Sequence, residues 1–330
     1  MVVSEKVQGP VNHQDTKFSI ERMPESIGVP LCHGRAYDYI AQERPFLFVG
    51  LLVVRGAGRV GTFVAELVEF FKRYHARTYG WDGAPIHDAL ALAHAFLGYV
   101  YRRRGRLRDA EKSLRESLRL ADRVGQGGLP MHWEAASMLI DTLLARGHAL
   151  EAKAVADRYG FAPPSASTIY VPDAMSVRGR LLLALGHTEE GLNELEATAK
   201  ALTARGQYNT VLAPWAYDLA RALATEDPRR AGDLVADARV QAERFGTDTA
   251  IGEAVRCAAS LETGSRAVAL YAKAVTYLEA SPCQYEHAVA RVEYGIASGA
   301  VEELERGLAL ARACGADGLA ARAEVGLAGV

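Results

Sequence analysis

The sequence predicts an all-α protein, and more closely an α-solenoid in which helix–turn–helix pairs stack side by side. Three observations lead to this prediction. A phrase of apolar helix, short turn and second amphipathic helix recurs from about residue 97, the helical stretches each show one apolar stripe, and alanine is common where neighbouring helices would touch. Such a pair buries too little surface alone, so stacking must supply the core.

The turns inside the pairs recur at steps of about 35 to 42 residues, close to the period of tetratricopeptide-like repeats. Glycine ends a helix well because it adopts the left-handed conformation at no steric cost, and proline suits the first turn of a helix. Pro228 is therefore expected to begin a helix directly after its turn. The predicted turns lie at Gly105, Gly147, Gly186, Asp227, Gly264 and Gly299.

The second helix of the first pair shows the helical pattern most clearly. Leu107, Ala110, Leu114, Leu118 and Ala121 recur at three- and four-residue steps beside charged positions. This spacing places them on one side of a helix, and that side must face another helix.

The chain divides into three predicted regions. Residues 1–45 contain four prolines and no sustained period, which predicts an irregular, poorly ordered N-terminal segment. Residues 46–96 form a second piece, and residues 97–330 form the tetratricopeptide-like α-solenoid. A helix from about residue 89 to 104 joins these two regions. Residues 159–173 contain three prolines and predict a loop within the solenoid.

Composition excludes several classes of function. The net charge is -2 and 49% of the residues are hydrophobic, whereas a dedicated nucleic-acid-binding domain is usually strongly basic. The longest apolar run, residues 46–54, is shorter than the roughly 20 residues that a membrane span needs. The N-terminus has no basic start followed by an apolar stretch, so no signal peptide is expected. We therefore expect a cytoplasmic protein with no membrane partner and no direct contact with nucleic acid.

The cysteines and histidines show no spacing typical of a metal site or a catalytic triad. Cys257 and Cys314 lie in alanine-rich helical stretches, which predicts buried free thiols. From the residues alone we expect no cofactor, no metal and no catalytic group.

Residues 133–330 resemble the tetratricopeptide-like C-terminal region of the large ATP-binding LuxR-type transcriptional regulators. Matching phrases include VRGRLLLALGHTEEGLNELEATAKAL and LERGLALARACGADGLAARA, and they occur in the family's order. The resemblance implies a sensor region that binds a protein or a small effector on the concave face of the solenoid.

The same family also carries a P-loop ATPase and a DNA-binding helix-turn-helix. Here Gly56–Thr62 reads GAGRVGT, which lacks the lysine that contacts the nucleotide phosphates. The sequence given ends where the resemblance places the helix-turn-helix. The resemblance therefore implies a truncated regulator, or a chimeric reading frame, that acts as a non-catalytic sensor or interaction region.

Residues 57–95 resemble a different family, the inosine-uridine nucleoside hydrolases, through an amphipathic helix and a G-x-P-x-H-D element. The resemblance implies that His87 lies at the leaving nucleobase and that Asp88 helps to hold calcium. Calcium takes six to eight oxygen ligands, and the Asp-Asp pair of the family's N-terminal loop is missing from this sequence. The alternative function is thus an inactive ribohydrolase remnant. The simpler interpretation places His87 at a helix start and Asp88 in its first turn.

Two other features allow two interpretations each. The arginine-rich run at residues 102–108 could bind phosphate or an acidic partner, but a solvated helix end is the commoner outcome. Tyr208, Trp215 and Tyr217 surround a proline, and they either line a ligand groove or pack between two repeats.

Overall fold

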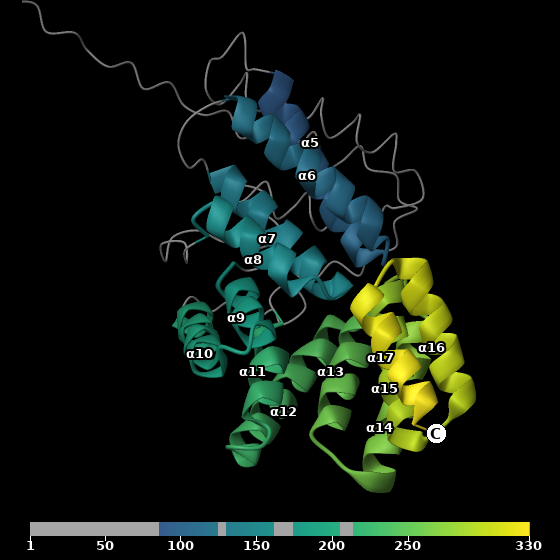
Figure 1. Ribbon diagram of the computed structural model, residues 1–330. Coiled ribbons are helices and arrows are strands. Elements are labelled where there is room, and N and C mark those ends of the chain that lie inside the picture. The colour runs from purple at the N-terminus through teal and green to yellow at the C-terminus, as the bar shows by residue number, and fades with distance from the viewer. Residues whose placement is uncertain (1–85, 125–129, 162–173, 205–213, 330) are drawn as a thin grey trace, which may run out of the picture. The chain divides into compact units, whose positions relative to one another are not determined.

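The computed structural model describes residues 86–124, 130–161, 174–204 and 214–329, all of which belong to one compact unit, Ala57–Val330. Within these ranges the regular structure is entirely α-helical, and Figure 1 shows the helices from blue to yellow in chain order. Six consecutive helix pairs stack on one another and a single helix follows them. The predicted all-α solenoid is therefore confirmed.

In each pair we call the first helix the inner helix and the second the outer helix, because the first helices share a cavity described below. The pairs are α5 (Ile86–Arg103) with α6 (Leu107–Val124), α7 (Pro130–Arg146) with α8 (Ala149–Arg158), α9 (Ala174–Ala184) with α10 (Thr188–Ala204), α11 (Trp215–Leu223) with α12 (Pro228–Phe245), α13 (Asp248–Ser260) with α14 (Gly264–Glu279), and α15 (Gln284–Ser298) with α16 (Val301–Cys314). The last helix is α17 (Asp317–Ala328).

All six predicted turns fall at the junction of the two helices of a pair, with Gly264 as the first residue of α14. Five are built on a glycine with a positive φ, for example 76° at Gly105 and 87° at Gly147. The sixth is built on Asp227, whose side chain accepts a hydrogen bond from the Arg230 backbone N–H at 3.1 Å, with Pro228 in the first turn as expected. Local turn chemistry thus sets the register of the repeats.

Close contact between inner and outer helices depends on glycine. A methyl group added at Gly98 would come within 2.4 Å of the Leu114 Cγ atom, and one added at Gly295 within 2.7 Å of the Leu304 Cγ atom. Gly179 and Leu195, and Gly252 and Leu278, make the same kind of contact. Four of the six pairs therefore seat a buried leucine of the outer helix directly on the backbone of an inner helix.

The first pairs also contact the last helices, and we call this set of interactions the closure contact. Arg146 at the end of α7 donates from Nε to the Gly315 carbonyl oxygen at 3.1 Å and from Nη2 to Asp317 at 2.6 Å. The backbones of Gly147 and Gly318 touch, so that a methyl group on Gly147 would lie 2.6 Å from the Gly318 Cα atom. Segments far apart in the sequence are thereby joined by polar and backbone contacts.

Other predictions have mixed outcomes. Cys257 and Cys314 are buried free thiols, as predicted. The helix expected over residues 89–104 is part of α5, which runs through the boundary placed between residues 96 and 97. The predicted loop lies between α8 and α9, although residues 162–173 are outside the described part, as are the segment 1–45 and its boundary. None of the described helices has the length and apolar character that crossing a bilayer requires.

Candidate functional site

The residues singled out from the sequence lie in different places. His87 and Asp88 are in the first turn of α5, and their side chains are outside the described part of the structure. Tyr208 is also outside it. Trp215 and Tyr217 both lie on α11 and are only 6% and 3% exposed. Two residues apart on a helix, they point to different sides, and each lines a different hollow.

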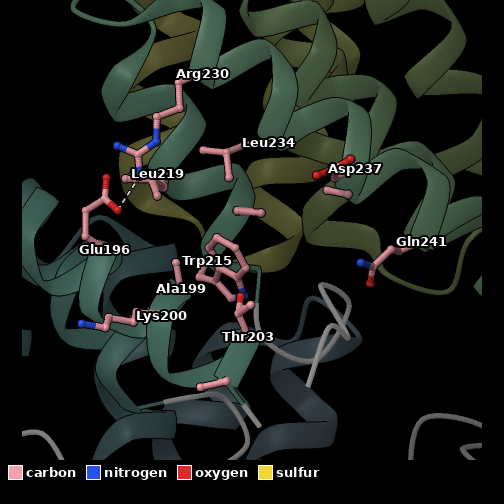
Figure 2. Close-up of a pocket in the computed structure, with 13 residues that line it drawn as sticks. Glu196, Ala199, Lys200, Thr203, Trp215, Leu219, Arg230, Leu234, Asp237 and Gln241 are labelled. Carbon is pink, nitrogen blue, oxygen red and sulfur yellow. Dashed lines mark hydrogen bonds and ion pairs between the residues drawn. The ribbon is translucent and has the colours of Figure 1, made fainter. Parts of the chain in front are cut away.

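The larger hollow is a groove formed by α10, α11 and α12, with a volume of about 540 Å³ (Figure 2). Trp215 and Leu219 provide its apolar surface. Arg230 pairs with Glu196 at one side, and Asp237 and Gln241 lie on the same outer helix as Arg230. The groove is thus an apolar surface that is bordered on one side by the ion pair of Arg230 with Glu196.

The second hollow, a cavity of about 360 Å³, differs because every one of the six inner helices contributes to it. Its lining is dominated by charged side chains, and we call it the charged cavity. The charged lining residues are Arg102 and Arg103 on α5, Asp141 on α7, Arg180 on α9, Asp218 and Arg221 on α11, Glu253 and Arg256 on α13, and Glu286 on α15.

Ion pairs link five of these inner helices, each to the next. Arg102 donates to Asp141 at 3.0 Å and to Glu286 at 3.1 Å, and so connects α7 through α5 to α15. Its guanidinium also lies over the Tyr285 ring, 4.8 Å from the ring centre. Arg180 continues the series, since it pairs with Asp141 on one side and with Asp218 at 3.3 Å on the other. Arginines and acidic residues therefore alternate along one series of ion pairs that runs from α11 through α9, α7 and α5 to α15.

The carboxyl groups of the cavity differ in their electrostatic balance. Burial alone would raise the pKa of Asp141, but Arg102 and Arg180 together hold it below the usual value. Burial also raises the pKa of Asp218, and there Arg180 and Arg221 offset it only in part. The pKa of Glu253 is raised by burial and by the nearby Glu286 carboxylate, against the attraction of Arg103. The neighbouring arginines therefore outweigh the effect of burial at Asp141, but not at Asp218 or Glu253.

The arginine-rich run does not behave as a single surface. Arg102, at its start, is buried among partners, so the interpretation of the run as a solvated helix end is wrong for this residue. Arg106 and Arg108 are exposed, as that interpretation expects. The difference arises because Arg102 lies on the side of α5 that meets α7 and α15, where it pairs with Asp141 and Glu286, whereas the side chains of Arg106 and Arg108 extend to the surface.

Sequence reasoning missed most of the charged cavity, although a signal for it exists. Arg102 and Asp141 are 39 residues apart, and Asp141 and Arg180 are again 39 residues apart. This spacing lies within the range of the repeat steps, and Arg256 pairs with Glu293 across a similar 37 residues. Charges that recur at the repeat period with alternating sign indicate a line of ion pairs along one side of a solenoid.

Comparisons with known proteins do not assign the chain. It matches no family model and no curated protein. In the part of the chain that the structure describes, His, Cys, Asp and Glu side chains do not come together in a group of three that could hold a metal ion. The side chains of the charged cavity offer hydrogen-bond donors and acceptors of both signs to a polar molecule.

Proposed function

We propose that this chain is a non-catalytic, tetratricopeptide-like sensor or protein-interaction region, of the kind that LuxR-type regulators carry, and that it binds its effector in the charged cavity. The main support is that six helices from six different repeats meet at this one cavity. A molecule bound there contacts several repeats at once. Its binding energy then acts on how the repeats stack, which is what a sensor requires.

The ion pairs of the cavity also suggest how binding is transmitted. Arg102 belongs both to the cavity lining and to the link between α5 and α15, through Glu286. An effector that competes for Glu286 or Arg102 changes the strength of that link. The arrangement of the first and last helices then depends on whether the cavity is occupied.

A thermal-shift screen tests this proposal. The wild-type chain is screened against pools of small polar metabolites and short synthetic peptides, together with Arg221→Met in the cavity and Arg119→Ala on the outer helix α6 as the matched control. We expect compounds that raise the melting temperature of the wild type and of Arg119→Ala but not of Arg221→Met. Hydrogen exchange of the bound form should slow in the inner helices.

Two results would contradict the proposal. Compounds that stabilise Arg221→Met as well as the wild type place the binding site elsewhere. Hydrolysis of inosine or uridine with added calcium, lost in Asp88→Ala, makes the chain an enzyme and favours the nucleoside hydrolase alternative.

A further inference from the structure

The charged cavity contains acceptor groups that the protein leaves unfilled. The Glu286 side chain is only 5% exposed, and its Oε1 atom accepts from Arg102, but its Oε2 atom is buried and has no hydrogen-bond partner among the described residues. Glu253 lines the same cavity, and burial together with the neighbouring Glu286 raises its pKa. A buried carboxylate oxygen without a partner carries a desolvation cost, so a donor that enters the cavity is favoured.

Donor groups are unfilled in the same cavity. The Arg221 guanidinium makes no hydrogen bond to any described residue, its Nη2 atom is buried, and its nearest acid oxygen, on Asp218, is 3.9 Å away. Arg256 commits Nη1 to Glu293 but leaves its buried Nε without a partner in the described structure. Arginine prefers to hold a carboxylate through two parallel hydrogen bonds, and Arg221 lines the cavity.

The two kinds of unfilled group lie in one small space. Arg221, Arg256, Glu253 and Glu286 all line this one cavity. A volume of about 360 Å³ is at the low end of ligand sites and suits a small molecule. A ligand of a single charge would fill one set of groups and leave the other buried without a partner.

We propose that the charged cavity binds a small zwitterion, a free amino acid or short peptide, whose carboxylate is held by Arg221 and whose ammonium group lies between Glu253 and Glu286. This rests on the proposed function and narrows it to one chemical class. An ammonium group supplies three donors, enough for both glutamates, and a carboxylate accepts the arginine fork. Both ends of the ligand are recognised, so each end contributes to affinity.

Ligand-observed NMR followed by calorimetry tests the inference on the full chain. The probes are the free amino acids and pooled dipeptides, their N-acetylated forms, which keep only the carboxylate, and their C-amidated forms, which keep only the ammonium group. We expect the zwitterions to bind, and acetylation or amidation of a binder to weaken it roughly tenfold or more, because each removes a charge-assisted contact.

Two variants identify which end each residue holds. Arg221→Met should bind the amidated and free forms equally, and Glu253→Gln should lose its preference for the free ammonium group over the acetylated form. Arg119→Ala, on the outer surface, should behave as the wild type. Circular dichroism melting establishes that each variant is folded, and Arg221→Met gives up only a long ion pair to Asp218, at 3.9 Å.

The outcomes separate this inference from the proposed function. Equal binding of acetylated and free forms, or no binding by any of the three probe sets, overturns the zwitterion. If the metabolite screen still yields a compound that depends on Arg221, the sensor function stands with a ligand of another class. If neither experiment yields a cavity ligand, both proposals are wrong.

Discussion

The inner and outer helices both carry arginines and acidic residues, but the ion pairs that these residues form differ between the two sets of helices. On the outer helices, many ion pairs join exposed side chains three or four residues apart in one helix, as in Arg119 with Glu116 and Arg306 with Glu302, and pairs between outer helices, such as Arg115 with Glu151, are exposed as well. On the inner helices, ion pairs form between helices and are largely buried, as in Arg102 with Asp141. Exposed pairs of the first kind contribute little to stability, whereas pairs of the second kind connect the repeats.

The largest effect is expected from removing an inner charge. Arg102→Met keeps the apolar volume but leaves Glu286 with only the longer ion pair to Arg103, at 3.8 Å, and leaves Asp141 with only Arg180. Loss of one partner of a buried pair costs about 3 to 5 kcal/mol of unfolding free energy. Arg119→Ala on α6 should cost far less, because its ion pair with Glu116 is exposed to solvent. Urea unfolding of both variants measures the difference, and equal losses would remove the distinction between the two layers.

A carboxyl on an inner helix should also make stability depend on pH. Burial raises the pKa of Glu134 on α7 from 4.5 to about 7. The native state then keeps a proton that the unfolded chain releases near pH 4.5, so the contribution of this group to stability falls as pH rises from about 4.5 to about 7, and then levels off.

Glu134→Gln removes this dependence. The variant should be more stable than the wild type by on the order of 2 to 3 kcal/mol at pH 8, with the difference vanishing at pH 4. Glu305→Gln on the outer helix α16, where the side chain is exposed, is the matched control and should show no such trend. Chemical denaturation at several pH values gives the two curves, and a constant difference for Glu134→Gln would contradict the assignment.

The closure contact allows a comparison around one shared partner. Arg146 and Arg115 both pair with Glu111, but Arg146 also reaches Asp317, whereas Arg115 reaches Glu151 on the neighbouring α8. The Arg146 side chain is 14% exposed and that of Arg115 is 47% exposed. Arg146→Ala should cost about 2 kcal/mol, since it removes charge-assisted contacts that are partly desolvated.

Arg115→Ala should cost less than about 1 kcal/mol, as is usual for exposed pairs. The two variants should also differ in hydrogen exchange. Faster exchange in α17 is expected for Arg146→Ala alone, and faster exchange there in both variants would mean that Glu111, rather than the contact with Asp317, holds the last helix in place.

The smallest effect on stability is expected from replacing a glycine, and it should differ between an inner and an outer helix. An alanine Cβ at Gly295 on α15 would lie 2.7 Å from the Leu304 Cγ atom and 2.9 Å from its backbone nitrogen. Overpacking costs about 1 to 3 kcal/mol and exceeds the helix-propensity gain of about 1 kcal/mol, so a net loss of about 1 kcal/mol is expected. Gly232→Ala on α12 meets open space and should be stabilising. Thermal melting of both variants decides, and stabilisation by Gly295→Ala would show that Leu304 moves aside freely.

Much of the fold was predictable because its signals are local. A glycine or a capping aspartate ends or begins a helix through its own backbone geometry, and so Gly105, Gly147 and Asp227 could be located without tertiary information. The charged cavity was not predicted, since a single arginine in a basic run looks the same whether it is solvated or buried. Only the recurrence of Arg102, Asp141 and Arg180 at the repeat period indicates their common side.

The closure contact could not be predicted from the sequence for another reason. Arg146 and Asp317 are 171 residues apart, and neither belongs to a motif. Their meeting depends on the summed rotation of all the intervening repeats, which no local pattern encodes. Trp215 and Tyr217 are an intermediate case, because their burial follows from the helical pattern whereas the two separate hollows that they line do not.

The closure contact has a consequence for how the protein melts and folds. In an open array of repeats, the terminal units have one neighbour each, and they fray first unless a polar cap covers them. Here the contacts of Arg146 and Gly147 with Gly315 to Gly318 give the first described pairs a second set of neighbours. We expect the described helices to unfold as one cooperative unit. The joining of such distant segments should come late in folding, after the helix pairs have formed, because long-range contacts carry the largest loop-closure entropy.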